Sequence, residues 1–148
     1  MNMKLSGRHE VQSFEDGEIV VREGEKSREM FIVRSGRVQI VKEVDGREVE
    51  LAILDRGSFF GEMALLEGLP RSAAARALGT TELLVLRPGS LLVQIRRDPT
   101  FAFELLQQMS RRIRRLNDSL MLAMASTGME DTSSAAWEYG AEGNTGKA

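Results

Sequence analysis

The chain has 148 residues, no cysteine and a single histidine, His9. It carries 20 lysine and arginine residues against 22 aspartate and glutamate residues, which gives a net charge of −2 at pH 7. This composition excludes disulfides and thiolate metal sites, and it argues against a metal site built from several histidines and against a globally basic surface for nucleic acid. No run reaches about 18 apolar residues, and residues 1–7 contain no apolar core of signal-peptide length, so we expect a cytoplasmic protein that does not contact a membrane.

Between Glu10 and Leu86, short apolar runs alternate with glycine or charged turns, a pattern typical of a β-sandwich or a barrel-like roll. We expect strands at residues 11–14, 19–22, 30–33, 37–42, 48–54, 73–77 and 81–86. Arg34-Ser35-Gly36 is predicted to turn the chain within one hairpin, and Asp45-Gly46 within a second hairpin. Gly79 is predicted to form a turn before the last strand.

The residues after Leu86 are predicted to be helical. Ser90 is expected to cap a short helix over residues 91–97, and Asp98-Pro99 to open a long helix that ends near Ala125. Apolar residues at alternating four- and three-residue steps form a heptad seam on this helix: Ala102, Leu106, Met109, Ile113, Leu116, Leu120 and Ala123. We therefore expect a homodimer through the helix of residues 98–125. The alternative is that the whole seam packs on the chain's own β-roll.

Four arginines surround Ile113 in the segment 111–115, the most basic run of the chain. They lie around a helix and form no element that reads a nucleic-acid groove, so we expect solvated helix faces with contacts to acidic residues.

The segment from Gly61 to Arg71 contains polar groups that core packing alone does not require. Gly61 can adopt a backbone conformation closed to other residues, and the good helix formers of residues 63–66 follow it, which predicts a tight turn that opens a short helix. The free amides at such a helix start attract an anion. Gly68 ends the helix, and Pro70 stiffens a loop that returns Arg71 toward the helix start. The segment thus predicts a binding site for one phosphate.

Glu62 is unexpected beside an anion site, because its carboxylate would repel the anion unless it faced another group. An ionised carboxylate only accepts hydrogen bonds, so the hydroxyl groups of a ribose would suit it while Arg71 holds a phosphate. The alternative is an ion pair between Glu62 and Arg71 that only ties the loop down.

Residues 60–66, Phe-Gly-Glu-Met-Ala-Leu-Leu, and residues 70–73, Pro-Arg-Ser-Ala, resemble the phosphate-binding cassette of the cyclic nucleotide-binding domain family. The resemblance covers roughly residues 8 to 125 and implies a mainly β fold with α: a double-stranded β-helix, or jelly-roll-like β-roll, followed by a long C-terminal helix. It implies that Glu62 receives the ribose 2′-hydroxyl and that Arg71 pairs with the cyclic phosphate. The other residues that it assigns to the ligand site are Phe60, Gly61, Met63, Ala64, Ser72 and Ala73.

In relatives of this domain the long helix lies over the base, so the resemblance adds Asn117, whose amide would read the purine edge; solvation on the helix face is the alternative. The polar residues 126–148 are predicted to form a disordered tail. Trp137 and Tyr139 stand out in this tail, and in some family members an aromatic residue from such a segment stacks on the base as a lid.

The resemblance implies a non-catalytic sensor, with cAMP as the ligand, cGMP as the alternative ligand and no prosthetic group. We expect residues 1–125 to form the binding domain and to signal to an unknown downstream protein. The tail is too short for the helix-turn-helix domain of the related bacterial regulators, so no direct DNA binding is expected, and whether the chain is complete or a fragment stays open. Another class of function is a ligand-free interaction module that dimerises through its long helix. An enzyme is the least favoured class, since the sequence offers no nucleophile–base pair near Glu62 and Arg71.

Overall fold

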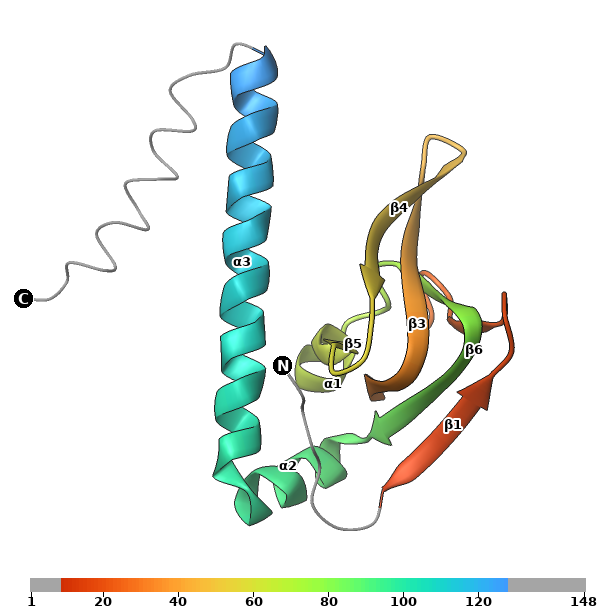
Figure 1. The fold of residues 1–148 in the computed structure, drawn as a ribbon, viewed down its shortest axis with the longest axis vertical. Coiled ribbons are helices and arrows are strands. Elements are labelled where there is room, and N and C mark those ends of the chain that lie inside the picture. The colour runs from red at the N-terminus through yellow and green to blue at the C-terminus, as the bar shows by residue number, and fades with distance from the viewer. Residues whose placement is uncertain (1–8, 128–148) are drawn as a thin grey trace, which may run out of the picture. The chain divides into compact units, whose positions relative to one another are not determined.

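The computed structural model describes residues 9–127, and this part of the chain contains six strands and three helices. In chain order the elements are β1 (Glu10–Phe14), β2 (Ile19–Val21), β3 (Met30–Val44), β4 (Arg47–Leu54), β5 (Phe59–Phe60), α1 (Glu62–Glu67), β6 (Ala74–Leu86), α2 (Pro88–Arg97) and α3 (Pro99–Thr127) (Figure 1). The chain forms two compact units, of which one runs to Glu104 and the other begins at Leu105.

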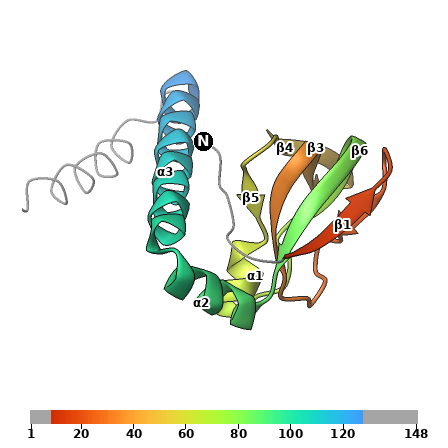
Figure 2. The ribbon, with the colours of Figure 1, turned by 60° about the horizontal axis from the view of Figure 1, so that its bottom comes forward.

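All six strands belong to one antiparallel sheet with the order β1-β6-β3-β4, and β2 and β5 pair with β6 and β3, respectively. Figure 2 shows β4, β3, β6 and β1 side by side in this order. The sheet does not close, because β1 and β4 at its two ends do not pair with each other. A mainly β fold followed by a long C-terminal helix is therefore confirmed.

Two strands are longer than predicted. The expected hairpin between residues 30–33 and 37–42 is wrong, since both segments belong to the single strand β3. Residues 74–86 likewise form the single strand β6, in which Gly79 does not reverse the chain. The register between the two strands shifts on either side of Ser35, which is the mark of β-bulges. Gly36 and Gly79 take φ values of 79° and 71° but lie inside β3 and β6, so these glycines mark irregular points within long strands and not turns between strands.

The second predicted hairpin is confirmed. Asp45 and Gly46 have φ values of 51° and 75°, as both central residues of a type I′ turn require, and they connect β3 to β4. Val44 pairs with Arg47 across this turn.

One cluster of the hydrophobic core is formed by side chains from β2, β3, β5 and β6. Its buried members are Val21, Phe31, Val33, Val38, Phe60, Ala75, Leu83 and Val85. Phe31 and Phe60 stack with ring centroids 5.0 Å apart, which joins β3 to the strand that leads into α1.

The start of α2 differs from the prediction. Ser90 does not cap the helix, which begins at Pro88 with Arg87 at the N-cap and no side-chain cap. Proline is favoured at the first helical position because its missing N–H would be unpaired there, so the helix begins at Pro88 and not at Leu91 as expected. The start of α3 is as predicted: it begins at Pro99, and Asp98 Oδ1 accepts a hydrogen bond from the Thr100 N–H at 3.1 Å.

Helix α3 extends to Thr127, so the first two residues of the predicted tail are helical. The remaining tail residues, with Trp137 and Tyr139, lie outside the described residues. On α3, the seam residues Leu106, Ile113, Leu116 and Leu120 are exposed in the single chain. Within residues 9–127, no helix combines the length and the apolar character needed to cross a membrane.

Candidate functional site

Glycine stands at both ends of α1, as the sequence indicates. Gly61 is the N-cap residue with φ 85°, and Gly68 is the C-cap residue with φ 70°. The Gly68 N–H donates to the carbonyl oxygen of Ala64 at 3.0 Å and closes the last turn. Because a glycine has no side chain to cap the first turn, the opening amides of α1 are not satisfied by an N-cap side chain.

Arg71 is held in place through its backbone. Its carbonyl oxygen accepts a hydrogen bond from the Gly24 N–H at 2.8 Å, and its own N–H donates to the Glu25 carbonyl oxygen at 2.9 Å. Both partners lie in the loop between β2 and β3, so the returning loop after α1 is fixed against a second loop.

The Arg71 side chain is only 3% exposed, so its guanidinium lies in the interior. All three guanidinium nitrogens donate hydrogen bonds: Nε to Ser27 Oγ at 3.1 Å, Nη1 to the Gly61 carbonyl oxygen at 3.3 Å, and Nη2 to Glu29 Oε1 at 3.5 Å. The contact with Gly61 places the guanidinium beside the residue that opens α1. The carboxylate partner of Arg71 in this structure is thus Glu29, a residue that the sequence analysis did not consider.

Burial lowers the pKa of the Arg71 guanidinium, while the nearby carboxylates of Glu29 and Glu25 act in the opposite direction. An arginine nevertheless stays protonated in a protein, so a buried positive charge persists here. Its carbon Cζ lies 5.8 Å from the centroid of the Phe31 ring, so a cation–π interaction with this core residue stabilises the positive charge.

Gly61 is required by space as well as by its backbone angle. A methyl group added at Gly61 would lie 2.8 Å from Arg71 Nη1 and 2.8 Å from the carbonyl oxygen of Glu29. Only glycine therefore allows α1, Arg71 and the residue before β3 to approach this closely.

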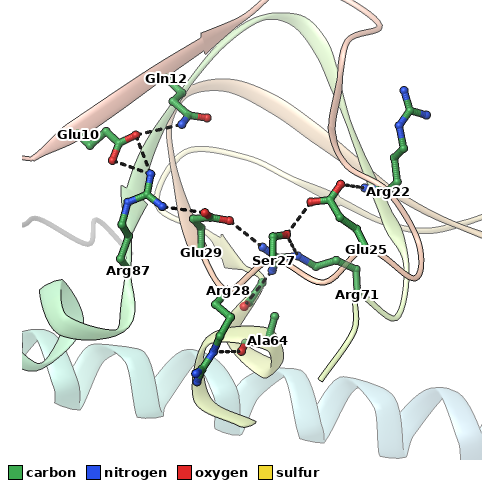
Figure 3. A network of polar contacts seen from close by, with 11 residues as sticks. Glu10, Gln12, Arg22, Glu25, Ser27, Arg28, Glu29, Ala64, Arg71 and Arg87 are labelled. Atoms are coloured by element: carbon green, nitrogen blue, oxygen red, sulfur yellow. Dashed lines mark hydrogen bonds and ion pairs between the residues drawn. The ribbon is translucent and has the colours of Figure 1, made fainter. Parts of the chain in front are cut away.

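Three consecutive residues before β3, Ser27, Arg28 and Glu29, bind Arg71 or α1 through their side chains (Figure 3). Ser27 binds Arg71 Nε and in turn donates to Glu25 Oε2 at 2.6 Å. Arg28 binds the C-terminal half of α1, because its Nε donates to the Ala64 carbonyl oxygen at 3.3 Å and its Nη2 to that of Leu65 at 2.8 Å. A charged side chain thus satisfies carbonyl groups at the end of this short helix.

Glu29 lies between two arginines in Figure 3. Its Oε1 faces Arg71 at 3.5 Å, and its Oε2 accepts a hydrogen bond from Arg87 Nη1 at 2.8 Å. Arg87 Nη2 also contacts both carboxylate oxygens of Glu10, at 3.2 and 3.3 Å. Glu10, followed by Glu29, raises the pKa of the Arg87 guanidinium. The site is therefore linked through charged groups to β1 and to the start of α2.

The other predicted site residues lie in different surroundings. Phe60 is buried in the core, so only its backbone is available to a ligand. Glu62 is the first residue of α1 and is half-buried, and Met63 beside it is exposed. Ser72 is exposed, and its carbonyl oxygen accepts a hydrogen bond from Lys42 Nζ at 2.6 Å. Asn117 is exposed on α3, in the unit that begins at Leu105, so its contact with a base stays a prediction.

The residues that the sequence analysis missed have one common signal. Residues 25–29, Glu-Lys-Ser-Arg-Glu, are polar and directly precede the fully buried start of β3. Charged groups joined directly to a buried strand indicate polar partners near the core.

Comparison with known proteins assigns the chain to a family. The family model described as "Cyclic nucleotide-binding domain" matches residues 11–98. The chain belongs to the cyclic nucleotide-binding domain family, as the cassette motif indicates.

Individual relatives come from different kinds of protein. The chain is 37% identical over 102 residues to a "Cyclic AMP receptor protein" of Thermus thermophilus, an alignment that covers 68% of this chain and 47% of the relative. It is 38% identical over 79 residues to a "cAMP-dependent protein kinase regulatory subunit" of Mycosarcoma maydis, with 53% of this chain and 15% of the relative covered. The crystal structure of the Thermus thermophilus catabolite activator protein is similar with a TM-score of 0.70 and 34% identity, covering 78% of this chain and 55% of that chain. The chain thus spans less than half of the length of these two curated relatives.

Proposed function

We propose that this chain is a non-catalytic sensor that binds a cyclic mononucleotide, with cAMP as the ligand and cGMP as the alternative. The observation that carries the proposal is the buried Arg71 guanidinium, which is directed at Gly61 where α1 begins. A permanent positive charge beside the start of α1, where no N-cap side chain binds the first amides, suits a phosphate that carries a single negative charge and is closed into a ring.

In this proposal, Arg71 pairs with the cyclic phosphate, and the backbone of Gly61, Met63 and Ala64 completes the anion site. The Glu62 carboxylate accepts the ribose 2′-hydroxyl, because an ionised carboxylate binds only donors. The remaining contacts are proposed for Phe60, Ser72 and Ala73 through the backbone beside the cassette, and for Asn117 at the base.

The choice of cAMP is supported by the relatives. One of them is named a cyclic AMP receptor protein, and a structure titled "cAMP bound PfPKA-R (141-441)" is similar to this chain with a TM-score of 0.55 and 28% identity. A structure of the enzyme Bd1971 in a "cGMP bound form" is also similar, with a TM-score of 0.56 and 26% identity, which is why cGMP is kept as the alternative.

Isothermal titration of the full chain with cAMP, cGMP and 5′-AMP tests the proposal. We expect saturable binding of cAMP, weaker binding of cGMP, and little binding of 5′-AMP, whose open phosphate carries more charge and a different geometry. The absence of saturation with both cyclic nucleotides would remove the proposal. Preferred binding of 5′-AMP would show that the site recognises a different phosphate.

The proposal extends to the output of the sensor. Residues 1–125 would form the binding domain, and a homodimer would form through the helix of residues 98–125, on which four large seam residues are exposed. Ligand would favour one arrangement of this helix because it binds that arrangement better than the other, and an unknown downstream protein would detect the difference. We place this sensor in the cytoplasm, in line with the lack of cysteine and of any apolar run of membrane-spanning length in the sequence.

The same exposed seam favours a second candidate, in which the domain dimerises and binds a partner without any ligand. Sedimentation of the nucleotide-free protein together with the titration separates the two: a dimer with no nucleotide response would favour the second candidate.

A further inference from the structure

Glu29 is shared between two arginines that lie far apart in the sequence. Its two carboxylate oxygens are used separately, Oε1 for Arg71 and Oε2 for Arg87. The side chain of Glu29 is 26% exposed, so the carboxylate is partly desolvated but free to adjust.

The two contacts differ in strength. The distance of 2.8 Å between Glu29 Oε2 and Arg87 Nη1 is that of a good charge-assisted hydrogen bond. The distance of 3.5 Å between Glu29 Oε1 and Arg71 Nη2 is at the limit of a hydrogen bond. Glu29 therefore holds Arg71 loosely and Arg87 firmly, and a small displacement of either arginine changes the balance.

Arg87 is placed where such a change has a structural effect. It is the N-cap residue of α2 and directly follows β6, and its guanidinium also contacts Glu10 on β1. The position of the Arg87 side chain therefore affects how the first turn of α2 is held against the sheet.

We propose that Glu29 competes with the bound anion for Arg71 and thereby couples occupancy of the site to Arg87 and the start of α2. This inference rests on the proposed function, because it needs a phosphate at Arg71. When the phosphate engages Arg71, Nη2 leaves Glu29 Oε1, and the whole Glu29 carboxylate becomes available to Arg87. The first turn of α2 is then held more firmly.

The coupling acts in both directions, as linkage requires. In the free protein, Arg87 attracts the Glu29 carboxylate, so Glu29 competes less strongly with the anion for Arg71. Loss of Arg87 leaves Glu29 with Arg71 alone, which lowers nucleotide affinity. Loss of the Glu29 charge removes the group that competes with the anion, which raises nucleotide affinity. Arg87 then has no further influence on nucleotide affinity.

A double-mutant cycle with Glu29→Gln and Arg87→Gln, measured by titration of the full chain with cAMP, tests the proposal. We expect Glu29→Gln to bind cAMP about fivefold more tightly and Arg87→Gln about fivefold more weakly than the wild type, at the low end of the range for coupled sites. In the Glu29→Gln background, Arg87→Gln is expected to have no effect. Equal effects of Arg87→Gln in both backgrounds would overturn the proposal.

Arg34→Gln is the matched control, since Arg34 is a β3 arginine whose ion pair is with Glu82 at 3.8 Å. It removes one positive charge from β3 without touching Glu29. An affinity loss in Arg34→Gln equal to that in Arg87→Gln would mean that net charge alone is responsible, and would also overturn the proposal.

Amide hydrogen exchange in the wild type needs no variant. We expect cAMP to slow exchange in the first turn of α2, and unchanged exchange there would contradict the coupling. If the wild type binds neither cAMP nor cGMP, the proposed function fails as a whole. If it binds cAMP but the cycle is additive, only the role of Glu29 fails.

Discussion

Arg71 Nη1 donates a hydrogen bond to the carbonyl oxygen of Gly61 at 3.3 Å, which joins the arginine at the end of the cassette to the glycine at its beginning. The same carbonyl oxygen accepts the Leu65 N–H at 3.3 Å, the bond that closes the first turn of α1. A single peptide group therefore contacts both the guanidinium and the first turn of α1, so a change at Gly61 is expected to alter both.

Gly61→Ala is expected to destabilise the protein by about 3 kcal/mol, because it adds steric overlap with Arg71 and Glu29 to the cost of a left-handed backbone. Gly17→Ala is the matched control, because Gly17 has nearly the same φ, 84°, but no atom within 4 Å of an added methyl group. Gly17→Ala should lower the free energy of unfolding by only about 1–2 kcal/mol. Urea unfolding of both variants measures the difference, and equal losses would show that the close approach at Gly61 is unimportant.

Arg28→Ala is expected to loosen α1, since it removes both side-chain hydrogen bonds to the carbonyl oxygens of Ala64 and Leu65. The loss of stability should be about 1–2 kcal/mol, with faster amide exchange in residues 62–68. Arg34→Ala, which removes an exposed arginine with a 3.8 Å ion pair, should change stability by less than about 0.5 kcal/mol. If the two variants behave alike, Arg28 does not hold the helix.

The fold could be predicted from the sequence where neighbouring residues alone determine the backbone conformation. Asp45 and Gly46 specify a two-residue turn through their own backbone preferences, and Gly61 and Gly68 do the same for the ends of α1. The continuity of β3 was not predictable in this way. Gly36 forms a bulge because it lies against Thr80 and Thr81 of β6, and such a contact depends on strand pairing that a single segment does not reveal.

The same distinction applies to the site. The cassette motif identified Arg71 because the residues that make it recognisable are contiguous. Glu29 was missed because its partners lie 42 and 58 residues away, and because a charged residue near a glycine turn is common.

The heptad seam on α3 predicts where a new negative charge would prevent two copies of the chain from associating. Leu116 and Leu122 are both highly exposed, at 69% and 73%, but only Leu116 belongs to the heptad seam. In sedimentation experiments, Leu116→Glu is expected to dissociate the proposed homodimer because it would place a charge inside the proposed coiled-coil contact. Leu122→Glu adds the same charge outside the seam and should leave the dimer intact. A monomeric wild type, or two variants that dissociate equally, would contradict the assignment of the interface.

The interactions of the Glu23 carboxylate predict that acid lowers the stability of the folded protein slightly. Its carboxylate accepts the Glu43 backbone N–H at 3.1 Å and contacts Lys42 Nζ at 3.2 Å, and these two interactions, the backbone one first, lower the pKa of Glu23. A lowered folded-state pKa means that the stabilisation is complete above the unfolded value of 4.5 and is lost as the pH falls through the folded value. We expect an NMR titration midpoint for Glu23 below 4.5. Lys42→Met should raise the midpoint only partly, because the backbone N–H remains; a midpoint unaffected by folding would contradict this account.

Arg71 and Glu62 are expected to contribute unequally to cAMP binding. Arg71→Ala removes a desolvated charge from the phosphate and should weaken binding about 100-fold, whereas Glu62→Ala removes a contact to a sugar hydroxyl and should weaken it about tenfold. Isothermal titration measures both, with Glu67→Ala at the other end of α1 as the control for Glu62 and with thermal unfolding as the check that Arg71→Ala still folds. Near wild-type affinity in both variants would refute the assigned roles, because a site that binds cAMP without this buried guanidinium and without this carboxylate must hold the nucleotide by other groups.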